Sequence, residues 1–249
     1  MTAARRVQHE PAWLLHHRPF RDSSQILDVL SRDHGRLALV ARGSRGAKSK
    51  LRGILRPFLP LQLSWVIRSD LGTLTGAEMN GAPLSLAGDA LLSGYYVNEL
   101  ILKLLHRHDP QTGIFSAYGT TIERLAGSND IAPCLRQFEI ELLRMLGYAL
   151  NLDHDTESQG PLRPQQHYEY RAEQGPVPVS GRDGPMIFTG MELVAIREQQ
   201  FAETAVLKKA GRLLRNVIDY HLDGRELNSR KVLRELRRSS MQKTTGIER

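Results

Sequence analysis

The spacing of apolar residues changes once along this chain, close to Pro83, and this change limits the possible folds more than any other feature. In the stretch 61–67 the largest apolar side chains occupy alternate positions, as they do in a half-buried strand. Beyond Pro83 apolar residues recur every three or four positions, which is the spacing of an amphipathic helix. The sequence therefore predicts a multi-domain protein with a β part, residues 1–80, followed by a mainly α-helical part, residues 81–249.

Five short stretches in the first part have the character of strands, and turn-forming residues such as those at 33–35 and 70–72 separate them. This many strands in so short a segment indicates a small closed barrel. The OB-fold is a five-stranded barrel that often binds oligonucleotides, although the fold alone does not establish that use. We therefore predict an N-terminal OB-fold barrel with strands at Trp13–Arg18, Gln25–Leu30, Arg36–Ala41, Leu61–Ile67 and Thr73–Ala77.

Helical periodicity dominates the second part, with one long interruption. Residues 152–188 lose this periodicity and contain five prolines and several glycines, so we expect an irregular excursion with one hairpin. A last short helix is expected after Ser229, which is a good N-cap residue. The other predicted helices span residues 91–105, 112–125, 133–149, 190–200 and 203–222.

Positive charge is concentrated at the two ends of the chain, whose formal net charge is +7. Residues 1–80 carry 13 Lys and Arg against 6 Asp and Glu. Residues 81–204 carry 9 against 16, and residues 205–249 carry 12 against 5. An even solvating coat of charge would not give basic ends around an acidic middle, so the ends are expected to bind a polyanion.

The sequence favours a cytoplasmic protein without a membrane partner. No stretch approaches the roughly 18 apolar residues that a membrane span needs, and no apolar run follows the arginines near Met1. Cys134 is the single cysteine, so an internal disulfide cannot form. The Cys and His spacing of a structural zinc site is absent as well. A reducing cytoplasm agrees with these observations.

The most basic stretch lies between two predicted strands, from Arg42 to Arg52, with Arg56 just beyond it. It contains no acidic residue and several small ones, which would let the backbone follow a phosphate chain closely. Lysine and arginine release counterions from nucleic acid, which is the sequence-independent part of affinity. A solvated loop without a ligand is the alternative. The predicted DNA-binding residues are Arg36, Arg42, Arg45, Lys48, Lys50, Arg52 and Arg56.

A second basic group lies near the C-terminus, where cations recur at helical spacing on one short predicted helix. It could form a second DNA surface or bind an acidic protein segment. A solvated terminal helix is the alternative. The residues concerned are Arg230, Lys231, Arg234, Arg237 and Arg238.

No pattern in the sequence indicates an enzyme or a cofactor site. His154 lies between Asp153 and Asp155, but adjacent residues rarely converge on one metal ion, and no second cluster supplies further ligands. The phosphate-loop and Gly-x-Ser-x-Gly patterns are absent, and Cys134 has no identifiable catalytic partner. We therefore expect a binding protein that is not an enzyme and carries no cofactor or metal.

An ordered series of short motifs along nearly the whole chain resembles the RecO family of DNA-repair mediators. Each motif is weak alone, but together, in order, and on a layout of barrel followed by helices, they are specific. The stretches concerned are Arg18–Leu27, His34–Gly43, Lys50–Gly53, Pro57–Leu61, Tyr96–Leu100, Leu135–Glu139 and Leu227–Arg230.

The resemblance implies an N-terminal OB domain that binds single- and double-stranded DNA and anneals complementary strands. It implies that the protein works with RecR and helps to load RecA onto DNA covered by single-strand-binding protein (SSB), without turnover chemistry. It also implies that the helical part recognises the acidic, Phe-ended C-terminal tail of SSB. Arg136 and Phe138 lie in the family segment associated with this contact, and Arg136 is a suitable carboxylate partner. The alternative is an arginine that only solvates its helix.

The segment 152–188 departs from the family pattern. Many members carry four cysteines that form a zinc site in the corresponding segment, and this chain has none of them. We therefore predict no bound zinc and expect packing of residues such as Tyr168 and Tyr170 to hold the segment together. Two other functions stay open: a protein-interaction adaptor whose basic ends bind acidic segments, and an RNA-binding OB module.

Overall fold

The computed structural model describes residues 5–127, 130–181 and 184–235. The chain divides into two compact units, one made of Met1–Ser128 with Leu227–Arg249 and the other of Asn129–Glu226. The C-terminal segment therefore belongs to the same unit as the N-terminal strands. No helix in the described ranges is long and apolar enough to cross a membrane.

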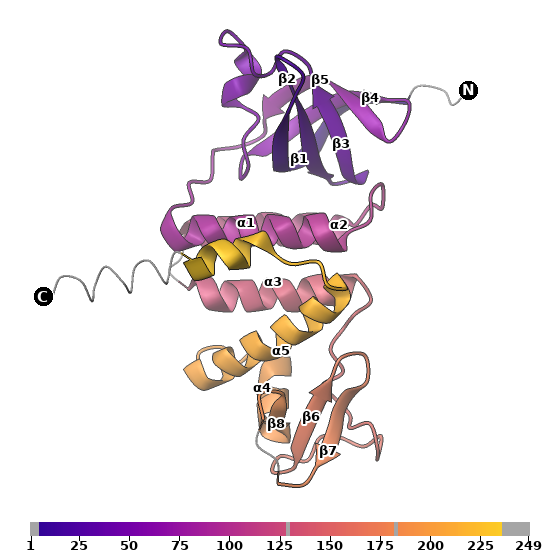
Figure 1. The fold of residues 1–249 in the computed structure, drawn as a ribbon, viewed down its shortest axis with the longest axis vertical. Helices are drawn as coiled ribbons and strands as arrows, with labels where there is room; N and C mark the ends of the chain where they lie inside the picture. The colour runs from indigo at the N-terminus through magenta and orange to yellow at the C-terminus, as the bar shows by residue number, and fades with distance from the viewer. Residues whose placement is uncertain (1–4, 128–129, 182–183, 236–249) are drawn as a thin grey trace, which may run out of the picture. The chain divides into compact units, whose positions relative to one another are not determined.

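Five strands within residues 5–127 close into a barrel (Figure 1). Their order around it is β1-β2-β3-β5-β4, with β3 and β5 parallel and the other paired neighbours antiparallel. This arrangement confirms the predicted N-terminal OB-fold barrel. The strands are β1 (Arg5–Phe20), β2 (Ser24–Ser31), β3 (Gly35–Ala41), β4 (Pro60–Ile67) and β5 (Leu71–Met79).

Strand β1 is much longer than the predicted stretch Trp13–Arg18, because one part of it pairs with β2 and another with β4. A bulge between Val7 and Glu10 re-aims the strand, and His9 there has a left-handed φ of 51°. The His9 N–H donates to Ser64 Oγ on β4 over 3.0 Å. The first residues of β1 are mostly exposed and polar, so they carry no apolar alternation by which the sequence could reveal them.

Alternate side chains of the strands fill the barrel. Leu14, Leu27, Leu39, Leu63 and Trp65 are each at most 1% exposed. Full burial of a leucine stabilises a fold by about 1.5–3 kcal/mol relative to exposure, so a core of this kind makes the barrel a firm scaffold. Loops that join its strands are then held in defined positions, where they can bind ligands.

Two helices, α1 (Gly88–Leu104) and α2 (Thr112–Gly127), belong to the same compact unit as the barrel. A buried polar chain connects them to β1. The Tyr118 hydroxyl donates to Asn98 Oδ1, and Asn98 Nδ2 donates to the carbonyl oxygen of Leu15, both over 2.8 Å. Since buried polar groups need partners, these two bonds favour one docking geometry of α1 and α2 on β1.

Residues 228–235 form a helix that begins beside α1 (Figure 1). The Glu99 carboxylate accepts hydrogen bonds from the backbone N–H groups of Asn228 and Ser229, over 2.9 and 2.8 Å, and from Ser229 Oγ over 2.7 Å. The prediction that Ser229 is the N-cap is therefore wrong. Ser229 lies inside the helix, and Glu99 supplies the oxygens that satisfy its first turn.

The second unit, in its described residues, combines three helices with an antiparallel sheet of order β7-β6-β8. The β6–β7 pair is the predicted hairpin, and the third strand, β8, is too short at three residues to show a period in the sequence. Tyr168 and Tyr170 are 0% and 5% exposed, which confirms that they pack within this segment. The elements are α3 (Ile131–Met145), β6 (His167–Arg171), β7 (Gly175–Val179), β8 (Ile187–Thr189), α4 (Gly190–Arg197) and α5 (Thr204–Leu222).

The compact units differ in their bounds from the predicted ranges 1–80 and 81–249. The change from strands to helices falls between β5 and α1, as expected, but α1, α2 and the segment from Leu227 group with the barrel. The division at residue 80 thus describes secondary structure, and as a boundary between functional domains it stays a prediction.

Candidate nucleic-acid interface

The basic loop, residues 42–56, follows β3 and is folded into successive hydrogen-bonded turns. Ser44 is 1% exposed, and its Oγ donates to the carbonyl oxygen of Ala41 over 2.9 Å. The Arg45 N–H donates to the carbonyl oxygen of Ser23 over 2.9 Å, which ties the loop to the turn between β1 and β2. The loop therefore presents its side chains from a defined backbone.

Apolar side chains hold the second half of the basic loop against the barrel. A short 3₁₀ helix, η1 (Lys50–Gly53), leads to Leu55, which is 4% exposed and belongs to the barrel core. Leu51 and Ile54 are half-buried and pack against the same core. Because these residues face the barrel, the basic residues between them face water.

All six cations of the basic loop are exposed, and none forms an ion pair with an acidic residue in the part of the chain that the structure describes. Arginines elsewhere differ: Arg32 pairs with Asp33 at 3.0 Å, and Arg144 with Glu141 at 2.6 Å. Like charges this close repel one another, and an anionic ligand would relieve the repulsion. The six are Arg42, Arg45, Lys48, Lys50, Arg52 and Arg56.

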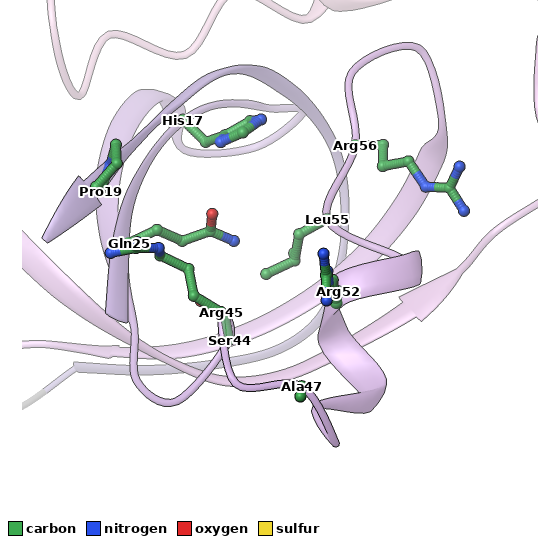
Figure 2. A pocket seen from close by; sticks show the side chains of 9 residues that line it. All are labelled: His17, Pro19, Gln25, Ser44, Arg45, Ala47, Arg52, Leu55 and Arg56. Carbon is green, nitrogen blue, oxygen red and sulfur yellow. The ribbon is translucent and has the colours of Figure 1, made fainter. Parts of the chain in front are cut away.

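A cavity of about 510 Å³ lies between the basic loop and the adjoining parts of β1 and β2 (Figure 2). Gln25 and Leu55 point toward its middle, whereas the guanidinium group of Arg56 points away. Arg45 Nη1 donates to the carbonyl oxygen of Arg21 over 3.3 Å, which orients that side chain along the wall. The residues that line the cavity include His17, Gln25, Arg45, Arg52, Leu55 and Arg56.

Two residues that line the cavity, His17 and Gln25, were not among the site residues predicted from the sequence. The pairing of β1 with β2 sets Pro19 opposite Gln25, and this register brings both strands to the cavity. Burial and the neighbouring charge of His16 hold the pKa of His17 below its ordinary value of 6.5. His17 is therefore mainly neutral at pH 7, and a phosphate beside it would favour its protonated form.

Arg36, which was predicted to bind DNA with the loop, lies apart from it. It occupies the start of β3, and at about 3.3 Å per residue the strand carries Arg42 roughly 20 Å further on. Arg36 is half-buried, and burial together with the charge of Arg107 lowers the pKa of its guanidinium, while Asp28 acts in the opposite direction. The structure therefore brings six of the seven predicted residues together in one loop and leaves Arg36 outside it.

The second predicted basic group is partly engaged with α1. Arg230 Nη2 donates to the Tyr96 hydroxyl over 3.3 Å, and its guanidinium lies 5.6 Å from the centre of the Tyr96 ring. Lys231 and Arg234 are exposed. A DNA contact at this helix stays a prediction that depends mainly on these two exposed residues. Two members of the group lie outside the described residues: Arg237 and Arg238.

Arg136 and Phe138, the predicted contacts for an acidic tail, lie on α3. Phe138 is 2% exposed, so its ring could shape a binding surface only from beneath. Arg136 Nη2 donates to Glu139 Oε1 over 2.5 Å, and its side chain is 18% exposed. Gly211 on α5 leaves space for this guanidinium, since a Cβ there would lie 2.8 Å from Nη1. The tail contact stays a prediction, and it requires Arg136 to bind a second carboxylate beside Glu139.

The acidic run 153–155 does not converge on one point. Asp153 pairs with Arg197 at 2.9 Å, whereas Asp155 accepts a hydrogen bond from the backbone N–H of Ser158 over 2.6 Å. Among the described residues, no group of three or more His, Cys, Asp and Glu side chains is placed to hold a metal ion. The basic loop and its cavity are thus the strongest candidate site.

Comparison with protein families covers both parts of the chain. Residues 6–82 match the family model described as Recombination protein O N terminal. Residues 86–231 match the model described as Recombination protein O C terminal. The division between the two matches falls between β5 and α1.

Curated relatives named DNA repair protein RecO are similar along almost the whole chain. The relative from Aromatoleum aromaticum is 41% identical over 237 residues, covering 95% of this chain and 99% of its own length. That from Nitrosospira multiformis is 38% identical over 232 residues, with coverages of 92% and 96%. That from Coxiella burnetii (strain RSA 493) is 40% identical over 229 residues, with coverages of 92% and 99%.

Proposed function

Because the chain belongs to the RecO family of DNA repair proteins, we propose that it binds single- and double-stranded DNA through the basic loop during recombinational repair. The observation that carries this proposal is the set of six exposed cations without carboxylate partners among the described residues. They project from a hydrogen-bonded loop on an OB-fold barrel, beside a cavity large enough for a ligand. Phosphate contacts dominate such an interface, so it has little sequence preference.

Annealing of complementary strands follows from the same charges. Two DNA strands repel one another through their phosphates, and a loop that offsets this charge lets them approach. With RecR as its partner, the protein would bind single strands that are coated with SSB and help RecA to displace the SSB. Family membership supports these roles, which need binding energy alone and no turnover chemistry or cofactor.

The acidic tail of SSB would bind on the second unit near Arg136. This side chain is partly exposed and lies over Gly211, with Phe138 beneath the surface of the same helix. A guanidinium can bind two carboxylates through separate N–H groups, so Glu139 and a tail carboxylate could share it.

Binding of a labelled single-stranded oligonucleotide across a salt series tests the proposed function. If four to six cations meet phosphates, the slope of log affinity against log salt is about −3 to −4, at about −0.7 per contact. A slope near zero would show that phosphates are not the ligand.

Two further ligands separate the alternative functions. An RNA strand of matched sequence would bind more tightly than DNA if the barrel were an RNA module, because such modules commonly use the 2′-hydroxyl group. An acidic peptide ending in Phe would bind strongly, and both oligonucleotides feebly, if the protein were an adaptor. We expect the protein to bind the DNA strand at least as tightly as the RNA strand.

A further inference from the structure

Gln25 carries an unpartnered amide inside the basic-loop cavity. The residue is 7% exposed, and its side chain makes no hydrogen bond with any residue that the structure describes. Its backbone is paired in the barrel, opposite Pro19 on β1 and Ala41 on β3, so the residue is fixed in position. The amide points toward the middle of the cavity (Figure 2). The donor and acceptor groups of the amide are open to the cavity and make no bond within the described residues, so they are available to a ligand there.

The cavity around this amide combines three kinds of surface. Arg45 and Arg52 supply positive charge on the loop side. Pro19 and Leu55 supply apolar surface, and the amide of Gln25 supplies one acceptor and two donor hydrogens. Its volume of about 510 Å³ lies within the range of sites that hold small organic ligands. A nucleotide has matching parts: a phosphate, a flat apolar face and a polar base edge.

We propose that this cavity is a site for one unpaired nucleotide of the bound strand, with the Gln25 amide hydrogen-bonded to the edge of its base. This inference rests on the proposed DNA binding and adds a base contact to the phosphate contacts. The base lies against Leu55 and Pro19, and Arg45 and Arg52 hold the adjoining phosphate. A side-chain amide matches adenine well and can pair in part with other bases, so the site is tolerant of sequence.

The site distinguishes single strands from duplexes. In a duplex the base is stacked and its pairing edge is occupied, so entering the cavity would require the base to leave the helix at a cost of a few kcal/mol. For a base that is already unpaired, this free-energy cost is much smaller. Gln25 therefore contributes to the binding of single strands and not of duplexes.

The test compares the wild-type protein with Gln25→Met on two strands of equal length, one with thymine bases and one abasic throughout. Methionine has nearly the same length and removes both hydrogen-bonding groups. We expect the substitution to weaken binding of the thymine strand by about three- to tenfold, the worth of one hydrogen bond, and to leave the abasic strand within about twofold. The salt slope stays unchanged for both strands because no phosphate contact is lost.

Other outcomes separate this inference from the proposed function. Equal weakening on both strands would assign Gln25 a structural role and overturn the inference, while salt-dependent binding of either strand would leave the proposed function intact. Weak, salt-independent binding of both strands by the wild-type protein would overturn the two together. If Gln25→Met does not fold, the wild-type protein still decides: equal affinity for the thymine and abasic strands contradicts a base site, and tighter binding of the thymine strand supports one.

Discussion

The backbone N–H of Arg45 donates to the carbonyl oxygen of Ser23 over 2.9 Å, so the most basic loop of the protein is fastened to the turn that joins β1 to β2. This bond brings the loop cations and the strand residues His17 and Gln25 to one cavity. A loop that already has its binding conformation in the free protein loses less conformational entropy when it binds nucleic acid, so its affinity is higher.

Ser44→Ala removes the buried hydrogen bond to the carbonyl oxygen of Ala41 that stabilises the first turn of the basic loop. We expect the free energy of unfolding to fall by about 1 kcal/mol, the usual worth of such a bond. Urea unfolding measures this change. Ser69→Ala, at an exposed position between β4 and β5, is the control and should change stability by less than about 0.5 kcal/mol. Equal effects of the two substitutions would mean that the Ser44 bond does not hold the loop.

Glu99→Gln weakens the attachment of helix 228–235 to α1, because the carboxylate accepts three hydrogen bonds from its first turn. We expect faster amide hydrogen exchange in this helix at pH 7, with about 1–2 kcal/mol less protection. Glu123→Gln, an exposed change on α2, is the control. Unchanged exchange in Glu99→Gln would show that the helix is held by other contacts.

The same carboxylate makes the attachment sensitive to acid. Burial tends to raise the pKa of Glu99, but the hydrogen bonds from Ser229 and Asn228 and the charge of Lys103 outweigh it, so the pKa lies below its ordinary 4.5. A lowered folded-state pKa contributes stability that is present above about 4.5 and is lost as the pH falls further. Wild-type protection of helix 228–235 should therefore decrease below pH 4.5 and that of Glu99→Gln should not.

Tyr118→Phe tests the buried chain that docks α1 and α2 on the barrel. Burial raises the pKa of Tyr118 well above its ordinary value of 10.0, so the folded protein keeps a proton that the unfolded chain releases above pH 10. Stability supplied by this group is therefore complete below pH 10 and falls by about 1.4 kcal/mol per pH unit above it. Urea unfolding between pH 9 and 11 should show a shallower decline for Tyr118→Phe, and an unchanged decline for the exposed Tyr95→Phe. Identical declines for wild type and Tyr118→Phe would contradict this assignment.

The segment 152–188 is expected to be stable without zinc, since Tyr168 and Tyr170 are buried within it and the segment contains no cysteine. A chelator should leave the thermal midpoint within about 1 °C, because only a structural metal couples chelation to unfolding. Metal analysis of the purified protein provides the second measurement. Stoichiometric zinc, or a large loss of stability with chelator, would contradict the prediction.

The barrel could be predicted from sequence because strand alternation survives wherever one face is buried, as it is around Leu63 and Trp65. The polar start of β1 and the three-residue β8 have no such alternation. Helix α3 was expected to reach residue 149 but ends at Met145, and Gly147 takes a left-handed φ of 82° just beyond it.

The candidate site could be predicted only in part. The six cations of the basic loop were predicted because they are close together in the chain and charge can be read from a sequence. Arg36 was grouped with them although it lies at the opposite end of β3 from the loop. Gln25 was missed, because only the closed barrel and the folded loop show that its side chain lines a cavity. The Ser229 prediction failed for a similar reason: the cap comes from Glu99, 130 residues earlier in the chain.

The most direct test of the account is the salt dependence of single-strand binding by a variant with five loop cations changed to Gln. These are Arg42, Arg45, Lys48, Lys50 and Arg52. The matched control makes the same change of net charge at five exposed cations of the second unit: Arg144, Arg163, Arg171, Lys208 and Arg215. We expect weak binding and a salt slope smaller by about 3 for the loop variant, and binding close to that of the wild type for the control. An unchanged slope in the loop variant, or an equal loss in the control, would place the DNA elsewhere and contradict the assignment of the basic loop.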